Sequence, residues 1–164
     1  MAFSNLKEVY VDQLQDIYSA NRQALGATRS LAEKANNSEL KEALNRGVNG
    51  IQEGLDVIEG LVKAHGEDPR GEFCKGMEGI VAEVKAHALD ADFDDKDAQD
   101  ATIITQYQRM AHYGIAGYGC VTAFARRLGL DDQADKLQDC LDATYHGDKE
   151  MTVIALGDVN KAAA

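Results

Sequence analysis

The sequence has almost no proline and has no long apolar run. Its 164 residues include one proline and no tryptophan, and no segment alternates as a strand would. No stretch is apolar enough to cross a bilayer, and residues 1–8 lack the charged-then-apolar pattern of a secretion signal. We therefore expect a cytoplasmic protein that forms one helical domain over residues 1–164.

Positive charge is also scarce. The chain has 17 Lys and Arg residues against 28 Asp and Glu residues, for a net charge of −11. Because phosphate binding needs a basic face, we expect no nucleic acid as a partner. Anionic membrane surfaces are disfavoured for the same reason.

Cysteine is rare, and its spacing indicates neither a disulfide framework nor a zinc site. The three cysteines are Cys74, Cys120 and Cys140, an odd number without a CxxC pair. Cys120 and Cys140 lie at similar distances from a turn at Gly129 and could be neighbours on antiparallel helices. We interpret all three as small buried residues with free thiols.

Helical periodicity dominates the rest of the sequence. Apolar residues at steps of three and four predict long helices over 4–35 and 39–65, a third ending at 128, and a fourth starting at 131. The segment Asn36-Asn37-Ser38 and Asp131 are expected to cap helices, and Gly66 and Gly129 to end them. Pro69 is expected to begin a shorter extra helix, which an acidic linker over 90–97 follows.

These helices predict an all-α fold with a defined topology. The two short turns make two antiparallel hairpins, and the extra helix and its linker form one long connection between them. A four-helix bundle with one long crossover is the ferritin-like topology.

A layer of small residues crosses the middle of the predicted bundle. The inward positions at this level are Asn21, Gly47, Gly50, Gly54, Ala111, Gly114, Thr144 and Gly147. Glycine costs about 1 kcal/mol relative to alanine inside a helix. Such a layer either leaves a cavity that binds a ligand or lets the helix backbones pack closely.

Three polar residues in or beside this layer favour a cavity, because burying Asn21, Thr144 and Asp148 dry and unpaired would be costly. Tyr107 and Tyr118 bracket the layer and could bond a ligand, although they could equally fill the core. The residues expected to line a cavity for a small organic ligand are Asn21, Gly50, Gly54, Tyr107, Ala111, Gly114, Tyr118, Thr144 and Asp148.

The residues needed for a two-metal carboxylate site are missing. Such a site takes a Glu from each of two helices and a Glu-x-x-His pair from each of the other two, and no such pair occurs mid-helix. We therefore predict no metal site and no cofactor. Glu53, His112, His146 and Asp148 could still form a degenerate metal site. Asp148, His112 and His146 are the candidates for metal-free acid/base catalysis, so enzymatic activity stays open.

Four segments of the sequence resemble one known family. They are DQLQDIYSA at 12–20, SELKEA at 38–43, CKGMEG at 74–79 and QRMAHYGIAGYG at 108–119. Together they resemble the YciE/YciF-type ferritin-like bacterial stress-response proteins, over nearly the whole chain. The resemblance implies a ferritin-like bundle that assembles as a homodimer.

The chain departs from the family at the positions of its di-iron ligands. By resemblance, glutamates are expected at or near the positions of Asn21, Gly50, Ala111, Gly114 and Thr144, and His or Gln near Gly54. The resemblance therefore extends to the fold but not to the di-iron site. Our first hypothesis is a metal-free bundle whose vacated site is a cavity for a small organic ligand. One alternative is an enzyme that uses the same cavity. Another is a purely structural homo-oligomer built through the short extra helix and the exposed faces of the first two long helices.

Overall fold

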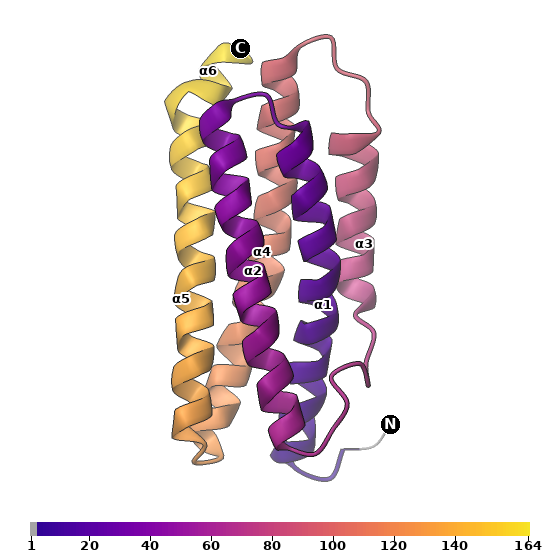
Figure 1. The fold of residues 1–164 in the computed structure, drawn as a ribbon, viewed down its shortest axis with the longest axis vertical. Coiled ribbons are helices and arrows are strands. Elements are labelled where there is room, and N and C mark those ends of the chain that lie inside the picture. The colour runs from indigo at the N-terminus through magenta and orange to yellow at the C-terminus, as the bar shows by residue number, and fades with distance from the viewer. Residues whose placement is uncertain (1–2) are drawn as a thin grey trace.

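Four long helices run side by side in the computed structural model, which describes residues 3–164 (Figure 1). The helices are α1 (Leu6–Lys34), α2 (Ser38–Ala64), α3 (Lys75–Val84), α4 (Lys96–Arg127), α5 (Asp131–Ile154) and α6 (Asn160–Ala162). A π-helical turn over Lys85–Leu89 extends α3, and another over Ala155–Val159 joins α5 to α6. No strand occurs within residues 3–164.

The long helices form two antiparallel hairpins, α1 with α2 and α4 with α5. Helix α3 lies in the connection between the hairpins and packs on α1 and α4 (Figure 1). The predicted all-α, ferritin-like bundle with one long crossover is thus confirmed. None of the helices in the described part of the chain is both long and apolar enough to cross a membrane.

Several helix ends follow the sequence signals. The Asn37 side chain accepts a hydrogen bond from the Leu40 backbone N–H at 3.0 Å and so caps α2. Gly66 and Gly129 have φ angles of 79° and 71°, a conformation that favours glycine, and they follow the ends of α2 and α4.

The predictions for Pro69 and Asp131 are wrong. The Asp68 carboxylate accepts a bond from the Arg70 backbone N–H at 2.9 Å, which holds Pro69 in a turn instead of a helix. Helix α3 begins at Lys75, and the Cys74 thiol occupies its cap position. Asp131 is the first residue of α5, after Leu130 at the cap, so it is not the cap residue, although its charge suits the positive end of the helix dipole.

The prediction of three buried cysteines is wrong at one position. Cys74 is buried and Cys140 is half-buried, but Cys120 is exposed. Tyr118 and Val121 take the inward positions on this part of α4, so Cys120 lies outside the inward stripe.

The apolar core is divided into two clusters along the bundle. One contains Leu31, Leu40 and Ile103, and the other contains Leu14, Ile58 and Leu137. At the end of the first cluster, the fully buried Asp100 carboxylate accepts bonds from the backbone N–H groups of Asn36 and Asn37, at 2.9 and 2.7 Å. This carboxylate ties the α1–α2 turn to the start of α4.

Candidate functional site

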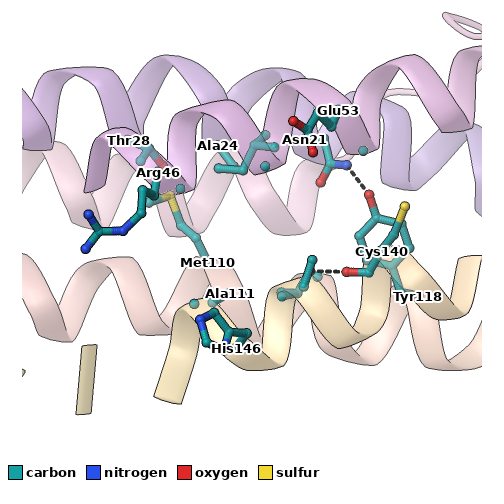
Figure 2. Close-up of a pocket in the computed structure, with 18 of the residues that line it drawn as sticks. Asn21, Ala24, Thr28, Arg46, Glu53, Met110, Ala111, Tyr118, Cys140 and His146 are labelled. Atoms are coloured by element: carbon teal, nitrogen blue, oxygen red, sulfur yellow. Dashed lines mark hydrogen bonds between the residues drawn. The ribbon is translucent and has the colours of Figure 1, made fainter. Parts of the chain in front are cut away.

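A central pocket of about 480 Å³ lies among the four long helices at the level of the small-residue layer (Figure 2). Its walls come from α1, α2, α4 and α5, and Met77 of α3 also contributes. The exposed residues among its lining all belong to α2 and α5. The central pocket therefore opens to solvent between α2 and α5.

The glycines of the layer have two different roles. A Cβ atom on Gly54 would lie 2.5 Å from the Tyr118 hydroxyl, and one on Gly47 would lie 2.7 Å from the Tyr107 hydroxyl. These two glycines let the tyrosine rings lie against the backbone of α2. By contrast, a Cβ atom on Gly50 would meet no heavy atom within 4 Å. Gly50 therefore borders open space.

A buried hydrogen bond marks one end of the central pocket. The Asn21 Nδ2 group donates to the Tyr118 hydroxyl at 2.7 Å, and Cys140 lies beside this pair (Figure 2). Burial raises the pKa of the Tyr118 phenol well above its ordinary value. Burial, with a smaller effect of Asp139, raises the pKa of the Cys140 thiol to about 11. All these groups are therefore neutral at physiological pH.

Two further buried hydroxyl groups line the central pocket. Thr28 is completely buried, and its Oγ1 atom has no hydrogen-bond partner within residues 3–164. The Tyr107 side chain is 7% exposed. Burial is the main cause that raises the pKa of Tyr107 to about 12, and the negative charges of Glu150 and Asp148 act in the same direction.

Charged side chains lie at the mouth of the central pocket. Arg46 of α2 and Glu150 of α5 form an ion pair of 2.7 Å across the opening. Lys136 and Asp139 also line the pocket from α5. Sequence reasoning missed Arg46, Lys136 and Asp139, because charged positions beside an apolar stripe look like an ordinary solvated helix face.

Most residues predicted to bind a ligand come together around this pocket. Those that line it are Asn21, Gly50, Gly54, Tyr107, Ala111, Gly114, Tyr118 and Thr144. The placement of Asp148 is wrong. Its carboxylate accepts a bond from Gln108 Nε2 at 3.1 Å and pairs with His112 Nε2 at 3.2 Å, outside the pocket. Gly147 takes the inward position, and Asp148 lies about 100° farther around the helix.

The four candidates for a degenerate metal or acid/base site are separated. Glu53 and His146 lie at the mouth of the central pocket. Asp148 and His112 lie outside the pocket, and the His112 side chain is 66% exposed. Within residues 3–164, no group of three or more His, Cys, Asp or Glu side chains is arranged to hold a metal ion. The residues of the pocket therefore do not fit a di-iron centre.

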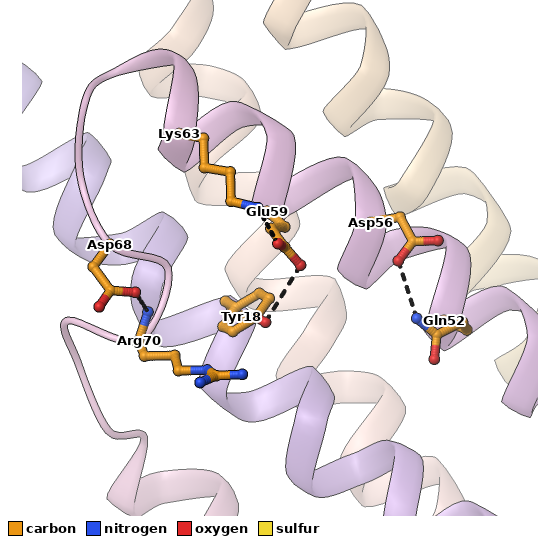
Figure 3. A network of polar contacts seen from close by, with 7 residues as sticks. All are labelled: Tyr18, Gln52, Asp56, Glu59, Lys63, Asp68 and Arg70. Carbon is orange, nitrogen blue, oxygen red and sulfur yellow. Dashed lines mark hydrogen bonds and ion pairs between the residues drawn. The ribbon is translucent and has the colours of Figure 1, made fainter.

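A second, smaller hollow of about 290 Å³ lies between α1 and the loop that precedes α3. Tyr18, Arg22, Arg70 and Phe73 are among its lining residues. Next to it, the Tyr18 hydroxyl contacts Glu59 at 3.5 Å, and Glu59 also pairs with Lys63 (Figure 3). This hollow falls just below the usual volume of ligand sites, about 300–1,000 Å³, so the central pocket is the stronger candidate site.

Comparisons with known proteins agree over nearly the whole chain. The model of the family described as "Domain of unknown function (DUF892)" matches residues 5–164. Protein YciF of Escherichia coli (strain K12) is 27% identical over 164 residues, which cover 99% of this chain and 98% of YciF. These matches confirm the resemblance to YciF-type proteins.

Two solved structures have the same fold. The crystal structure of the E. coli stress protein YciF matches with a TM-score of 0.89 and 26% identity, over 97% of this chain and 99% of that chain. YcfI from Rhodopseudomonas palustris matches with a TM-score of 0.84 and 28% identity, over 92% of this chain and 98% of that chain. The bundle architecture is therefore shared with YciF along its full length.

Proposed function

This chain belongs to the DUF892 family and is related to the stress protein YciF, and from that premise we propose that it binds a small organic molecule instead of a di-iron centre. The observation that carries the proposal is the central pocket. Its volume of about 480 Å³ lies within the usual range of ligand sites, about 300–1,000 Å³. The pocket occupies the level at which the family resemblance implies iron ligands.

The chemistry of the walls supports an organic ligand. Hard metal ions such as iron bind through several converging oxygen and nitrogen ligands. Here the corresponding positions are occupied by Asn21, Gly50, Ala111, Gly114 and Thr144. These residues offer space, apolar surface and a few neutral polar groups, which is the usual composition of a pocket for a small organic molecule.

Acid/base catalysis gains no specific support from the geometry. The one carboxylate–histidine contact among the candidates, Asp148 with His112, lies outside the central pocket, and its histidine is largely exposed to water. A base that acts on a bound molecule must come within hydrogen-bond reach of it. We therefore favour a binding protein over an enzyme.

A ligand panel with a blocked variant tests the proposal. In Ala111→Leu, added carbon atoms occupy the central pocket, while Ala116→Leu places the same side chain on an exposed part of α4. A ligand at 100 times its dissociation constant should stabilise the wild type by about 2.7 kcal/mol. For a chain of this size, we expect a rise in Tm of about 5–10 °C.

The expected result is a rise in Tm for the wild type and Ala116→Leu, and no rise for Ala111→Leu. Ligands that stabilise all three proteins equally would place binding elsewhere and refute the proposal. Iron bound near stoichiometry after purification without chelator would also refute it. A cytoplasmic location and a homodimer stay predictions, which cell fractionation and light scattering can check.

A further inference from the structure

The inner wall of the central pocket carries polar groups but no buried charge. Its interior polar side chains are those of Asn21, Thr28, Tyr107, Tyr118, Cys140 and Thr144, and the Thr144 hydroxyl already donates to the Cys140 backbone oxygen at 2.8 Å. The charged residues of the lining lie at the mouth instead, where Arg46 is already paired with Glu150. An ionised ligand group inside the pocket would therefore lose its hydration without meeting an opposite charge.

Thr28 is the most informative group in this wall. Buried polar atoms in folded proteins almost always have a hydrogen-bond partner. Three buried side-chain atoms in residues 3–164 have none, Thr28 Oγ1, Gln106 Oε1 and Thr122 Oγ1, and among these residues Thr28 is the one that lines the central pocket. A ligand that fills the pocket can supply the missing partner.

The two ends of the central pocket differ in whether their hydrogen-bonding groups are already paired. At one end, Tyr118 and Asn21 already bond each other, and Cys140 lies beside them (Figure 2). Toward the other end, Thr28 lies seven residues after Asn21 on α1, and its hydroxyl is unpaired (Figure 2). A polar group on the ligand would therefore gain most at the Thr28 end.

We propose that the ligand is a neutral, mostly apolar organic molecule with a hydroxyl or carbonyl group that bonds Thr28 Oγ1. This inference rests on the proposed binding function and adds the chemical class and the orientation of the ligand. The hydroxyl of Thr28 can both donate and accept, so it suits either group. The apolar body of the ligand then lies against Ala24, Met110 and the glycines of α2.

Three probes of similar shape separate the alternatives: naphthalene, naphthol, and naphthoic acid, whose carboxyl group is ionised at neutral pH. Their dissociation constants would be measured by titration calorimetry at neutral pH. One added hydrogen bond should make naphthol bind about three- to tenfold more tightly than naphthalene. Naphthoate should bind at least about tenfold more weakly than naphthol, because its charge would be buried without a partner.

Variants at Thr28 test the named contact. Thr28→Val keeps the shape of the side chain and removes the hydroxyl. It should therefore weaken the binding of naphthol by about three- to tenfold and leave the binding of naphthalene unchanged. Thr28→Ser keeps the hydroxyl and should retain most of the preference for naphthol. Thermal unfolding of each variant shows whether it folds normally.

Each contrary result has a separate meaning. Naphthoate binding more tightly than naphthol, or a Thr28→Val variant that still prefers naphthol, would overturn the inference and leave the proposed function standing. The inference also fails, and the proposed function stands, if no probe binds but a charged compound stabilises the wild type and not Ala111→Leu. If no compound of any class stabilises the wild type more than it stabilises Ala111→Leu, both the inference and the proposed function fail.

Discussion

Replacing Gly54 with alanine should destabilise the bundle, whereas the same replacement at Gly50, about one turn earlier on α2, should stabilise it. Alanine is favoured over glycine in a helix by about 1 kcal/mol, and this gain applies at both positions. At Gly50, the new Cβ atom would meet nothing within 4 Å. We therefore expect Gly50→Ala to raise the free energy of unfolding by about 1 kcal/mol.

At Gly54 the surroundings make the same replacement destabilising. The new Cβ atom would lie 2.5 Å from the Tyr118 hydroxyl, which is too close for any packed pair. Tyr118 is 4% exposed, and its hydroxyl accepts a bond from Asn21 that would be strained or lost if the ring moved away from α2. Overpacking costs about 1–3 kcal/mol, and losing the hydrogen bond costs about 1 kcal/mol more. After the helix gain of about 1 kcal/mol, Gly54→Ala should destabilise by about 1–3 kcal/mol.

Urea denaturation followed by circular dichroism measures both changes. A double variant isolates the cause, because Tyr118→Phe removes the oxygen atom that the Cβ atom would meet. In the Tyr118→Phe background, Gly54→Ala should cost much less, and the difference is the interaction energy of the two sites. If Gly54→Ala stabilises the wild type as much as Gly50→Ala does, Tyr118 does not lie against Gly54, and the described pocket wall is wrong.

Three other residues give predictions of different kinds. Thr28→Val should raise the free energy of unfolding by about 1 kcal/mol in urea, because it removes a buried hydroxyl that lacks a partner. Asp100→Ala should lower it by about 3 kcal/mol, since the backbone N–H groups of Asn36 and Asn37 lose their acceptor. Burial raises the pKa of Tyr107 to about 12 in the folded protein, from the ordinary tyrosine value of 10.0. Between these two pH values the folded state keeps the phenol proton, whereas the unfolded state loses it. Stability that is present below about pH 10 should fall towards pH 12, and Tyr107→Phe should flatten that fall.

Each of these predictions has a contrary outcome that is easy to recognise. A destabilised Thr28→Val protein would show that the hydroxyl has a partner, such as an ordered water molecule. An unchanged Asp100→Ala protein would mean that the α1–α2 turn does not depend on this carboxylate. For Tyr107, a Tyr107→Phe protein whose alkaline stability profile matches that of the wild type would show that the phenol titrates alike in both states.

The sequence predicted the helices and their inward faces well, because apolar spacing and capping residues act locally. Asn37, Gly66 and Gly129 mark helix ends through their own backbone geometry. Pro69 misled the prediction because a proline suits both a first helical turn and a tight turn. The Asp68 side chain, which bonds the Arg70 backbone N–H, decides between them, and periodicity does not reveal that bond.

The site was harder to predict, since its details depend on contacts between helices. Periodicity brought Asn21, Gly54 and Thr144 to one level, but it left the position of Asp148 ambiguous by one residue. That single step moves the carboxylate from the pocket to a contact with His112. The ion pair of Arg46 with Glu150 was also out of reach, because it depends on how α2 faces α5.

The position of the pocket mouth has a consequence for the motions of the protein. The mouth lies along the seam between α2 and α5, which belong to different hairpins. A molecule in the pocket touches both hairpins at once, so its binding energy opposes their separation. Partial openings that part the hairpins would become rarer as the free concentration of that molecule rises. The lifetime of the closed bundle would then depend on the free concentration of that molecule.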